Sequence, residues 1–391
     1  MCSSDLVLSG SVVLDLKRMN RVLEVDEKQG YALVEPGVSY FDLYRHLQDN
    51  KIRLWPDVPD PGWGSVMGNA LDRGAGYTSF QYRNHFDAHC GMEVVLANGD
   101  VVRTGMGAMP NAKTWGAYKS GFGPYVDGIF SQSNFGVVTK MGFWLMPEPD
   151  AYLRGIVYAP RYDDLIPLVE GMTHLENTKV FQGYPDLGSP LLGVPTLAGL
   201  HHFLVNGPPQ RDAEYGALLQ RGAGPREYEP YGQKHKLPFW SLGLTFYGPE
   251  KVIRAQWEHA QERFRVSVKG ATFEEREFYK LPLTEEQKGK LEYPAMLGIP
   301  NLRTFAIGAR SKLNPEHPTS GHIWFSPIIP RSGEAVLEAN EVFRKASREL
   351  GIEMLTAFSL PIPSWERSFI FIMAFSVFRD PAINKIGRAH V

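Results

Sequence analysis

Short β-branched and apolar runs, separated by turn residues, dominate the first 150 residues, which is the pattern of a strand-rich domain. It predicts strands at residues 11–16, 21–25, 30–37, 92–96, 101–103 and 139–145. Ser39 is a suitable N-cap for a helix over residues 40–50, in which Leu43 and Leu47 share one face. Asn98-Gly99 predicts a hairpin with a type I′ turn between two of the strands.

The pattern changes after the Pro-Glu-Pro of residues 147–149, where longer amphipathic stretches alternate with polar loops. Helices are expected at residues 250–264 and 333–350, and strands at residues 154–158, 239–247, 354–359 and 369–377. Residues 207–236 are rich in Pro and Gly and predict a surface excursion. The sequence thus predicts an α+β fold of two domains, residues 7–149 and 150–384, with an antiparallel sheet in the second.

The composition limits the kinds of molecule that the protein is expected to bind. With 41 basic and 43 acidic residues the formal charge is −2, which gives no reason to expect nucleic acid or an anionic membrane surface. No apolar run approaches the roughly 18 residues of a membrane span. Two cysteines in 391 residues exclude a disulfide framework and a cysteine-rich zinc site, and they leave the compartment, bacterial cytoplasm or periplasm, undetermined.

The two ends of the chain are related through their coding DNA. A sequence that encodes residues 1–6 also encodes residues 385–390 when its complementary strand is read in a shifted frame. This relationship is typical of a sequencing-library adapter, and such segments are set aside before the fold is considered. We therefore expect residues 1–6 and 385–391 to be adapter-derived and the natural protein to continue beyond both ends of residues 7–384.

Residues 56–77 form a glycine-rich stretch flanked by prolines, with glycines at positions 62, 64, 68, 74 and 76. Glycine leaves backbone amides uncovered, so the stretch is interpreted as a cradle for the anionic part of a large cofactor. The alternative is a set of tight turns in a β-rich domain. Neither the G-x-G-x-x-G pattern of a dinucleotide site nor a G-x-x-x-x-G-K-[ST] phosphate loop is present.

Asp60 lies between Pro59 and Pro61, which stiffen its backbone and fix the direction of its carboxylate. Beside a cofactor such a carboxylate can act as a base or adjust the cofactor's electronics. The alternative is an aspartate that bonds its own backbone in a turn.

Residues 131–138 place small polar side chains before Gly136, at the start of a strand. They predict a second cofactor wall, in which main-chain groups of residues 136–138 meet the edge of a heteroaromatic ring; a plain loop before a strand is the alternative. His85, His89 and Cys90 have the spacing of metal ligands but lack a further ligand, so no metal is expected and a core role is favoured.

Several longer motifs carry a family resemblance. D-V-P-D-P-G-W-G-S-V-M-G-N (57–69), F-S-Q-S-N-F-G-V-V-T (130–139) and segments 19–25, 34–40, 91–99 and 103–107 are similar to the flavoprotein family of vanillyl-alcohol oxidase, eugenol oxidase and 4-cresol dehydrogenase. The resemblance covers most of residues 10–149, and the later part of the chain is similar only in short segments such as W-F-S-P-I (324–328).

The resemblance implies FAD, a flavin domain of the p-cresol methylhydroxylase type and a cap domain with an antiparallel sheet. It implies oxidation or hydroxylation of para-substituted phenols, in which hydride passes from the benzylic carbon to flavin N5 and a p-quinone methide forms. The expected partners are a small phenolic substrate, oxygen or a cytochrome c as electron acceptor, and further copies of the chain in a homodimer or higher oligomer.

The resemblance also assigns site residues. It places Asp60 near flavin N5 as the catalytic residue, and Trp63 stands where the family usually has a small residue. The expected flavin contacts are Pro59, Gly64, Ser65, Gly68, Asn69, Arg73, Gly74, Gly76, Gly136, Val137 and Val138. The family's first pyrophosphate loop is expected before residue 11, and its phenolate-binding residues and flavin tether beyond residue 385. The chain alone is therefore expected to bind FAD poorly and to be inactive.

Two other functions remain open at this level. A FAD-dependent dehydrogenase of 2-hydroxy acids, of the lactate or glycolate type, has the same flavin domain with a different cap. A non-catalytic flavin-binding module is the second alternative.

Overall fold

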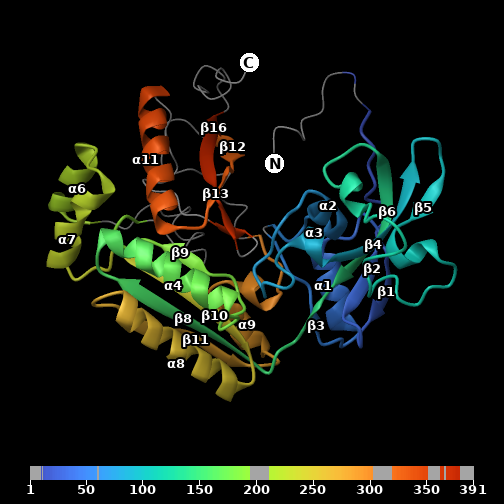
Figure 1. The fold of residues 1–391 in the computed structure, drawn as a ribbon, viewed down its shortest axis with the longest axis horizontal. Coiled ribbons are helices and arrows are strands. Elements are labelled where there is room, and N and C mark those ends of the chain that lie inside the picture. The colour runs from blue at the N-terminus through green and yellow to red at the C-terminus, as the bar shows by residue number, and fades with distance from the viewer. Residues whose placement is uncertain are drawn as a thin grey trace. The chain divides into compact units, whose positions relative to one another are not determined.

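The computed structural model describes residues 10, 12–59, 61–193, 211–302, 319–350, 362–364 and 367–378. The chain forms two compact units (Figure 1). The first comprises Val7–Pro149 and Leu281–Arg303, and the second comprises Asp150–Lys280 and Thr304–Val391 together with Met1–Leu6. The sequence placed residues 281–303 in the second domain, whereas their contacts lie in the first unit.

An antiparallel sheet of five strands organises the first unit, in the order β1-β2-β6-β4-β5. Its strands are β1 (Val22–Asp26), β2 (Tyr31–Val34), β4 (His89–Leu96), β5 (Val101–Arg103) and β6 (Gly136–Trp144). A two-stranded sheet joins β3 (Leu54–Trp55) to β7 (Met146–Pro147). The central strand β6 begins within residues 131–138, where the sequence placed the second cofactor wall.

Helices of the first unit are short apart from α1 (Tyr40–Asp49). Ser39 and Asp42 form the capping box at the start of α1, and Leu43 and Leu47 are buried, as the sequence predicted. The other helices are α2 (Val66–Leu71), α3 (His85–Ala88), η2 (Gly105–Ala108), η3 (Asp127–Phe130), α9 (Glu285–Lys290) and η6 (Pro294–Leu297).

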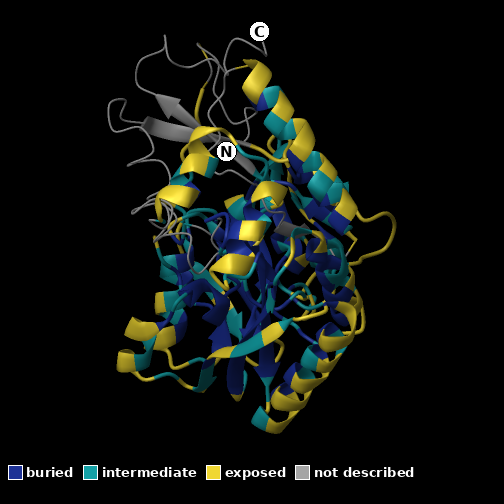
Figure 2. Ribbon diagram, turned by 90° about the vertical axis from the view of Figure 1, so that its left-hand side faces the viewer, coloured by how far each residue is buried: buried dark blue, intermediate teal, exposed yellow. Residues whose placement is uncertain are grey.

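The second unit is built on a four-stranded antiparallel sheet in the order β11-β8-β10-β9. The strands are β8 (Ala151–Ala159), β9 (Asp186–Gly188), β10 (Trp240–Gly248) and β11 (Thr272–Lys280). Helix α8 (Glu250–Ser267) packs Trp257 against Gly155 of the sheet, and its Phe264 lies against Gly171 of α4 (Leu165–Asn177). These contacts form one hydrophobic core, and Figure 2 shows buried strands beside helices that expose one side.

The second unit also contains several further helices and strands. They are η4 (Tyr162–Asp164), α6 (Ala213–Gln220), η5 (Pro225–Tyr228), α7 (Glu229–Lys234), β12 (Thr319–Phe325), β13 (Ile328–Pro330), α11 (Gly333–Leu350), β14 (Ile362–Ser364), β15 (Ser368–Ile370) and β16 (Met373–Phe378). The predicted α+β class and the antiparallel sheet of the second domain are confirmed.

Two predicted strands differ from the structure. Residues 12–16 form no strand, and Val12 is 95% exposed, because β-branched residues need a partner strand and this run has none among the described residues. Residues 211–236 lie mostly at the surface, as predicted, but they also form helices α6 and α7, in which Tyr215 and Tyr231 are buried. Residues 369–377 divide between β15 and β16. The strand predicted at residues 354–359 lies outside the described residues.

The hairpin between β4 and β5 forms, but its turn differs from the prediction. Gly99 donates to Leu96 O at 2.9 Å, and Gly99 has a positive φ of 89° while Asn98 does not. A type I′ turn needs positive φ at both central residues, so this is a type I turn over Ala97 and Asn98 followed by a left-handed glycine. The consequence is a three-residue loop.

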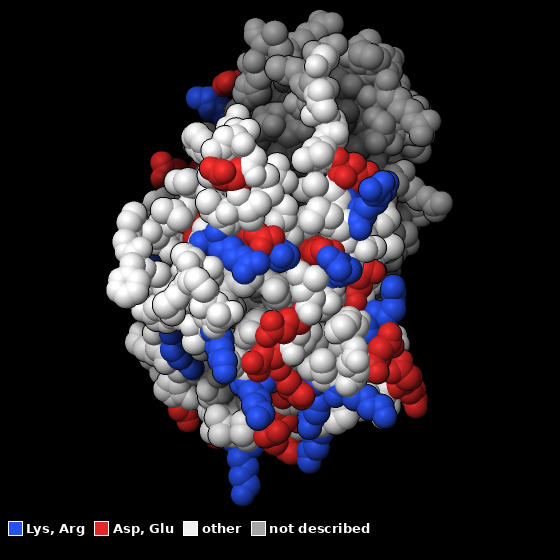
Figure 3. Space-filling view, turned by 90° about the vertical axis from the view of Figure 1, so that its right-hand side faces the viewer, with Lys and Arg blue, Asp and Glu red and all other residues white. Residues whose placement is uncertain are grey.

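Two surface properties of the described residues bear on possible partners. None of their helices is both long and apolar enough to cross a membrane. On the face drawn in Figure 3, Lys and Arg are interspersed with Asp and Glu, and neither sign forms a continuous field. A mixed surface of this kind produces no long-range attraction for a polyanion on that face.

Candidate cofactor site

Asp60, the predicted catalytic residue, lies outside the described residues. Both sides of its loop are nevertheless fixed. On one side Asp57, Val58 and Pro59 are buried. On the other side the Gly62 amide donates to Asn301 O at 2.9 Å, and Pro300 packs against Gly62. The described neighbours of Asp60 are therefore packed within the first unit on both sides.

Ser65 begins the short helix α2 that follows this loop. Its hydroxyl accepts from the Gly68 amide at 3.0 Å and donates to Pro36 O at 2.5 Å. Gly64 O accepts from the Tyr40 amide at 3.2 Å, which ties the loop to the first turn of α1. Ser65 is thus an N-cap and an anchor, a role that the sequence did not assign to it.

The glycine amides of the cradle are used within the protein. Gly62, Gly64, Gly68, Gly74 and Gly76 each donate to a protein acceptor, at 2.8 to 3.2 Å. The interpretation that these amides are uncovered and ready for an anionic ligand is therefore wrong. Their absent side chains matter in a different way.

Gly74 and Gly76 lie where other side chains press against the backbone. A Cβ at Gly76 would overlap the Asp57 carboxylate and come within 2.8 Å of His85 Nε2, and a Cβ at Gly74 would overlap the Asn69 amide. Glycine is required at both positions because buried polar groups pass beneath the cradle. The lack of a side chain at these two positions lets the backbone of the first wall lie directly against Asp57, His85 and Asn69.

The second predicted wall, residues 131–138, ends in the first half of β6. Residues 141–144 of β6 pair with β2, whereas residues 136–140 pair with β4 on one side, and no described strand pairs with them on the other. Successive residues of a strand point their amide and carbonyl groups to alternate edges. Part of the backbone of Gly136, Val137 and Val138 therefore faces an edge without a strand partner.

Direct contacts join the two predicted walls. Arg73 Nε donates to Ser131 Oγ at 2.9 Å, and Ser131 donates to Leu71 O at 3.1 Å. The Gln132 amide also donates to Leu71 O, at 3.0 Å, and its side chain donates to Asp72. The structure thus brings together two segments that the sequence alone could not link.

The arrangement fits a flavin in two respects. The open edge of β6 has the donors and acceptors that the rim of a heteroaromatic ring needs, and apolar surface flanks the walls, since Phe135 is 65% and Trp63 is 51% exposed. The residues that would hold it are those of the first wall, residues 61–76, and of the second, residues 131–138. Pro59 and Val138 are buried, so they support the walls from within.

Two buried histidine–aspartate pairs escaped the interpretation of the sequence. His85 Nε2 lies 2.8 Å from Asp57 Oδ2, and His89 Nε2 lies 3.0 Å from Asp127 Oδ2. The sequence favoured a core role for both histidines, and both are buried, but it did not predict their carboxylate partners. Each histidine has a carboxylate partner far along the chain, which local spacing cannot reveal.

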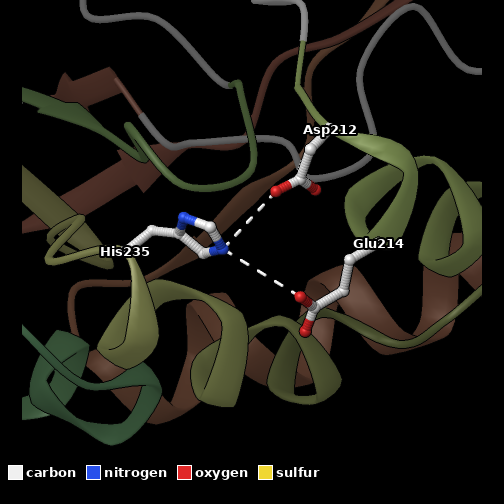
Figure 4. Close-up of side chains that lie close together, drawn as sticks. All are labelled: Asp212, Glu214 and His235. Carbon is white, nitrogen blue, oxygen red and sulfur yellow. Dashed lines mark ion pairs between the residues drawn. The ribbon is translucent and has the colours of Figure 1, made fainter.

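One group of three potential metal ligands occurs among the described residues, on the surface of the second unit. Asp212, Glu214 and His235 lie together in Figure 4, with His235 Nε2 3.5 Å from Asp212 and 4.0 Å from Glu214. Lys234 Nζ lies 2.5 Å from Glu214 and supplies a positive charge there. The group is adequately explained as exposed ion pairs that connect α6 with α7.

Comparison with known proteins places this site in a family. Residues 2–105 match the model of a FAD binding domain. The 4-cresol dehydrogenase [hydroxylating] flavoprotein subunit of Pseudomonas putida is 32% identical over 354 residues, 90% of this chain and 63% of that protein. The structure of p-cresol methylhydroxylase with substrate bound superposes with a TM-score of 0.75 at 28% identity, over 97% of this chain and 68% of that one.

These matches support a flavoprotein of the p-cresol methylhydroxylase and vanillyl-alcohol oxidase type. FAD is the cofactor of this family, and the fold class predicted from the sequence is that of p-cresol methylhydroxylase. The chain spans 63% of the length of its Pseudomonas putida relative. The glycolate oxidase subunit GlcD of Bacillus subtilis matches less of the chain, at 30% identity over 150 residues, 38% of this chain and 30% of that protein.

Proposed function

We propose that the protein is a FAD-dependent oxidoreductase that oxidises or hydroxylates para-substituted phenols, with its flavin domain in the first unit and its substrate cap in the second. Support comes from the extent of similarity: the phenol-oxidising relative matches 90% of the chain, whereas the glycolate oxidase subunit matches 38%. A relative that shares only the flavin domain would match only the first part of the chain.

Bound FAD would supply the hydride acceptor for the benzylic carbon of the phenol. The protein's part is to hold the ring and the substrate. In this proposal the contacts are the predicted ones: Pro59, Gly64, Ser65, Gly68, Asn69, Arg73, Gly74 and Gly76 in the first wall, and Gly136, Val137 and Val138 in the second.

Asp60 is proposed as the catalytic carboxylate, acting as a base toward the substrate or toward an added water. Support for this role comes from the sequence position of Asp60 between Pro59 and Pro61 and from its described neighbours, since Pro59 is buried and the Gly62 amide donates to Asn301 O. General-base catalysis needs a carboxylate that is held in one place.

The test uses the full-length protein loaded with FAD under anaerobic conditions. A panel of 4-alkylphenols, D-lactate and glycolate is added, and bleaching of the flavin absorption is followed. We expect bleaching with phenols alone. Bleaching with the 2-hydroxy acids alone, or with no compound of either class, would refute the proposal; the last result would favour a non-catalytic flavin-binding module.

The electron acceptor is tested in the same preparation. Hydrogen peroxide release on admission of oxygen indicates an oxidase, and reduction of added cytochrome c indicates a dehydrogenase. The relative from Pseudomonas putida is named a flavoprotein subunit, which supports a partner subunit and the dehydrogenase. A homodimer or higher oligomer is also proposed, and light scattering of the full-length protein measures it.

Asp60→Asn addresses the catalytic role directly. Loss of a general base is expected to lower turnover of phenols by about 10²–10⁴-fold, with FAD retained. Asp100→Asn, in the exposed hairpin turn between β4 and β5, is the matched control and should leave turnover unchanged. Equal turnover of Asp60→Asn and wild type would remove Asp60 from the mechanism.

A further inference from the structure

The junction between α3 and β4 presents two buried histidines four residues apart. His85 is the first residue of α3 and His89 the first of β4, and neither side chain is exposed. The function proposed above uses neither of them. Both face carboxylates that arrive from other parts of the first unit.

His85 connects the first wall to the core. Its Nε2 donates to Asp57 Oδ2 at 2.8 Å, since an ionised carboxylate can only accept. Its Nδ1 lies 3.0 Å from the Tyr40 hydroxyl and also contacts the Asn69 side chain, which belongs to the predicted flavin contacts. Thr78 completes the group by donating its amide to Asp57 Oδ1 at 2.7 Å.

Tyr40 is suited to be the donor toward His85. Burial, and secondarily the charge of Asp57, raise the pKa of Tyr40 well above its ordinary value. Its hydroxyl therefore keeps its proton across the physiological range. Asp57, His85, Thr78 and Tyr40 are all fully buried, and the half-buried Asn69 carries their contacts to the surface of the cradle.

His89 connects the second wall in a similar way. Its Nε2 lies 3.0 Å from Asp127 Oδ2 and 3.1 Å from the Tyr125 hydroxyl, and its Nδ1 contacts Phe86 O. Thr104 donates its hydroxyl to the same Asp127 oxygen at 3.0 Å. Asp127 opens helix η3, which leads directly into Ser131 and the second wall.

The two carboxylates hold corresponding places in the chain. Asp57 lies three residues before Asp60 and Asp127 lies four residues before Ser131, so each begins the segment that forms one wall. The two histidines that bind them are joined by a single helical turn, which fixes the distance between them. Because each histidine contacts one of the carboxylates, the helical turn between the histidines sets the distance between the starts of the two walls.

We propose that His85 and His89 act together as positioning residues that set the separation of the two flavin walls. We refer to this pair as the histidine clamp. The inference rests on the proposed location of the flavin between these walls, but not on the identity of the substrate. Loss of either histidine contact lets the two walls adopt other separations. The affinity for FAD then falls with the fraction of protein in which the walls keep the separation that binds FAD.

Substitution by Gln or Asn distinguishes the hydrogen bonds made by the two ring nitrogens of each histidine. The Gln side-chain nitrogen reaches the place of imidazole Nε2, so His85→Gln and His89→Gln keep the donor to their carboxylates. The Asn nitrogen reaches only the place of Nδ1, so His85→Asn and His89→Asn leave Asp57 and Asp127 without that donor. The Gln variants are therefore the conservative members of each pair.

The experiment measures the dissociation constant of FAD for each full-length variant by quenching of flavin fluorescence, without substrate, below the melting temperature of each apoprotein. Both Asn variants are expected to bind FAD at least about tenfold more weakly than wild type, with a shifted flavin absorption band, and both Gln variants within about threefold. Because no substrate is present, a protein that oxidises no phenol can still pass this test.

Asp164→Asn is the control for a merely structural role. Asp164 is as buried as the clamp carboxylates and accepts hydrogen bonds from Arg161, but it belongs to the second unit. This variant should lower the melting temperature and leave FAD binding unchanged. The clamp is refuted if the Asn variants, like Asp164→Asn, lose stability while binding FAD as wild type does, or if Gln and Asn variants weaken binding equally.

Milder variants cover the case in which an Asn variant does not fold. Thr78→Val removes the hydroxyl contact to Asp57 and Thr104→Val that to Asp127. Each is expected to weaken FAD binding by about two- to fivefold. Unchanged affinity in both would overturn the proposal as well.

Discussion

Arg73 donates from Nε to Ser131 Oγ across 2.9 Å, although the two residues are 58 positions apart. Arg73 has a left-handed backbone, with φ of 56°, and directly follows Asp72, the C-cap of α2. Ser131 in turn donates to Leu71 O at 3.1 Å. One serine hydroxyl therefore joins the end of the first wall to the start of the second.

Ser131→Ala removes both hydrogen bonds of this hydroxyl. Ser131 is buried, so the loss is expected to lower the free energy of unfolding by about 1–2 kcal/mol. Urea denaturation measures it. The control is Ser133→Ala, because Ser133 is exposed and its single bond to Ile129 O lies outside the wall contact, with an expected cost below about 0.5 kcal/mol. An equal loss of unfolding free energy in both variants would show that the contact between Arg73 and Ser131 does not stabilise the protein.

Gly62→Ala probes the close packing of Gly62 against residues 300 and 301. A Cβ at Gly62 would lie 2.6 Å from Pro300 Cβ and 3.1 Å from the Asn301 amide, and both belong to a backbone segment that cannot rotate away. Overpacking of this kind is expected to cost about 1–3 kcal/mol of unfolding free energy. Thermal unfolding of the variant measures the cost.

Gly289→Ala is the matched control for Gly62→Ala. Gly289 lies in α9 of the same unit, and a Cβ there would meet nothing within 4 Å. Ala is the better helix former, so this variant should be neutral or more stable by up to about 1 kcal/mol. A loss of stability at Gly289 comparable to that at Gly62 would contradict the steric explanation.

The parts of the fold that the sequence predicted are those with local causes. Ser39 could be recognised as the cap of α1 because its partner, Asp42, lies only three residues away. The hairpin at Gly99 was also visible locally, yet its turn type depended on the conformation of Asn98, which the dipeptide alone does not fix. Residues 12–16 have the composition of a strand and fail because a partner cannot be read from composition.

The same limit applies to the candidate site, where the residues in contact lie further apart in the sequence. The two walls could each be named from the sequence, but the contact between Arg73 and Ser131 spans 58 positions. The sequence attributed the glycines at 74 and 76 to uncovered amides, whereas the structure requires glycine there because of the buried Asp57 and His85 and the Asn69 amide. Only the folded chain brings those side chains beneath the cradle.

Cys90 is expected to be unreactive in the folded protein. It is 1% exposed in β4, and burial raises the pKa of its thiol to about 11. At pH 8 only about one thiol in a thousand is then ionised, so Ellman's reagent should label folded Cys2→Ser protein slowly, and faster as the pH rises toward 11. The same protein in guanidinium chloride is the control and should react at once. Rapid labelling of the folded protein at pH 8 would contradict the prediction.

Glu35→Gln should remove a pH-dependent part of the stability of the first unit. Glu35 is buried after β2 and accepts from the Arg21 amide at 2.9 Å and from its guanidinium at 2.8 Å. Hydrogen bonding by Arg21 lowers the pKa of Glu35 below its ordinary value, despite the opposing effect of burial. At pH 7 the variant is expected to be less stable by about 1–2 kcal/mol, because hydrogen bonds to a charged group are lost.

The sign of the pH dependence follows from that lowered pKa. The unfolded chain takes up a proton on Glu35 near pH 4.3, before the folded protein does, so the stabilisation is complete above that pH and is lost as the pH falls through the lower folded value. The stability difference between wild type and Glu35→Gln should therefore shrink as the pH falls below about 4.3. Glu27→Gln, at an exposed position in the β1–β2 turn, is the control and should keep a constant difference from wild type. A Glu35→Gln difference that stays constant to pH 2 would show that the charge of Glu35 does not stabilise the fold.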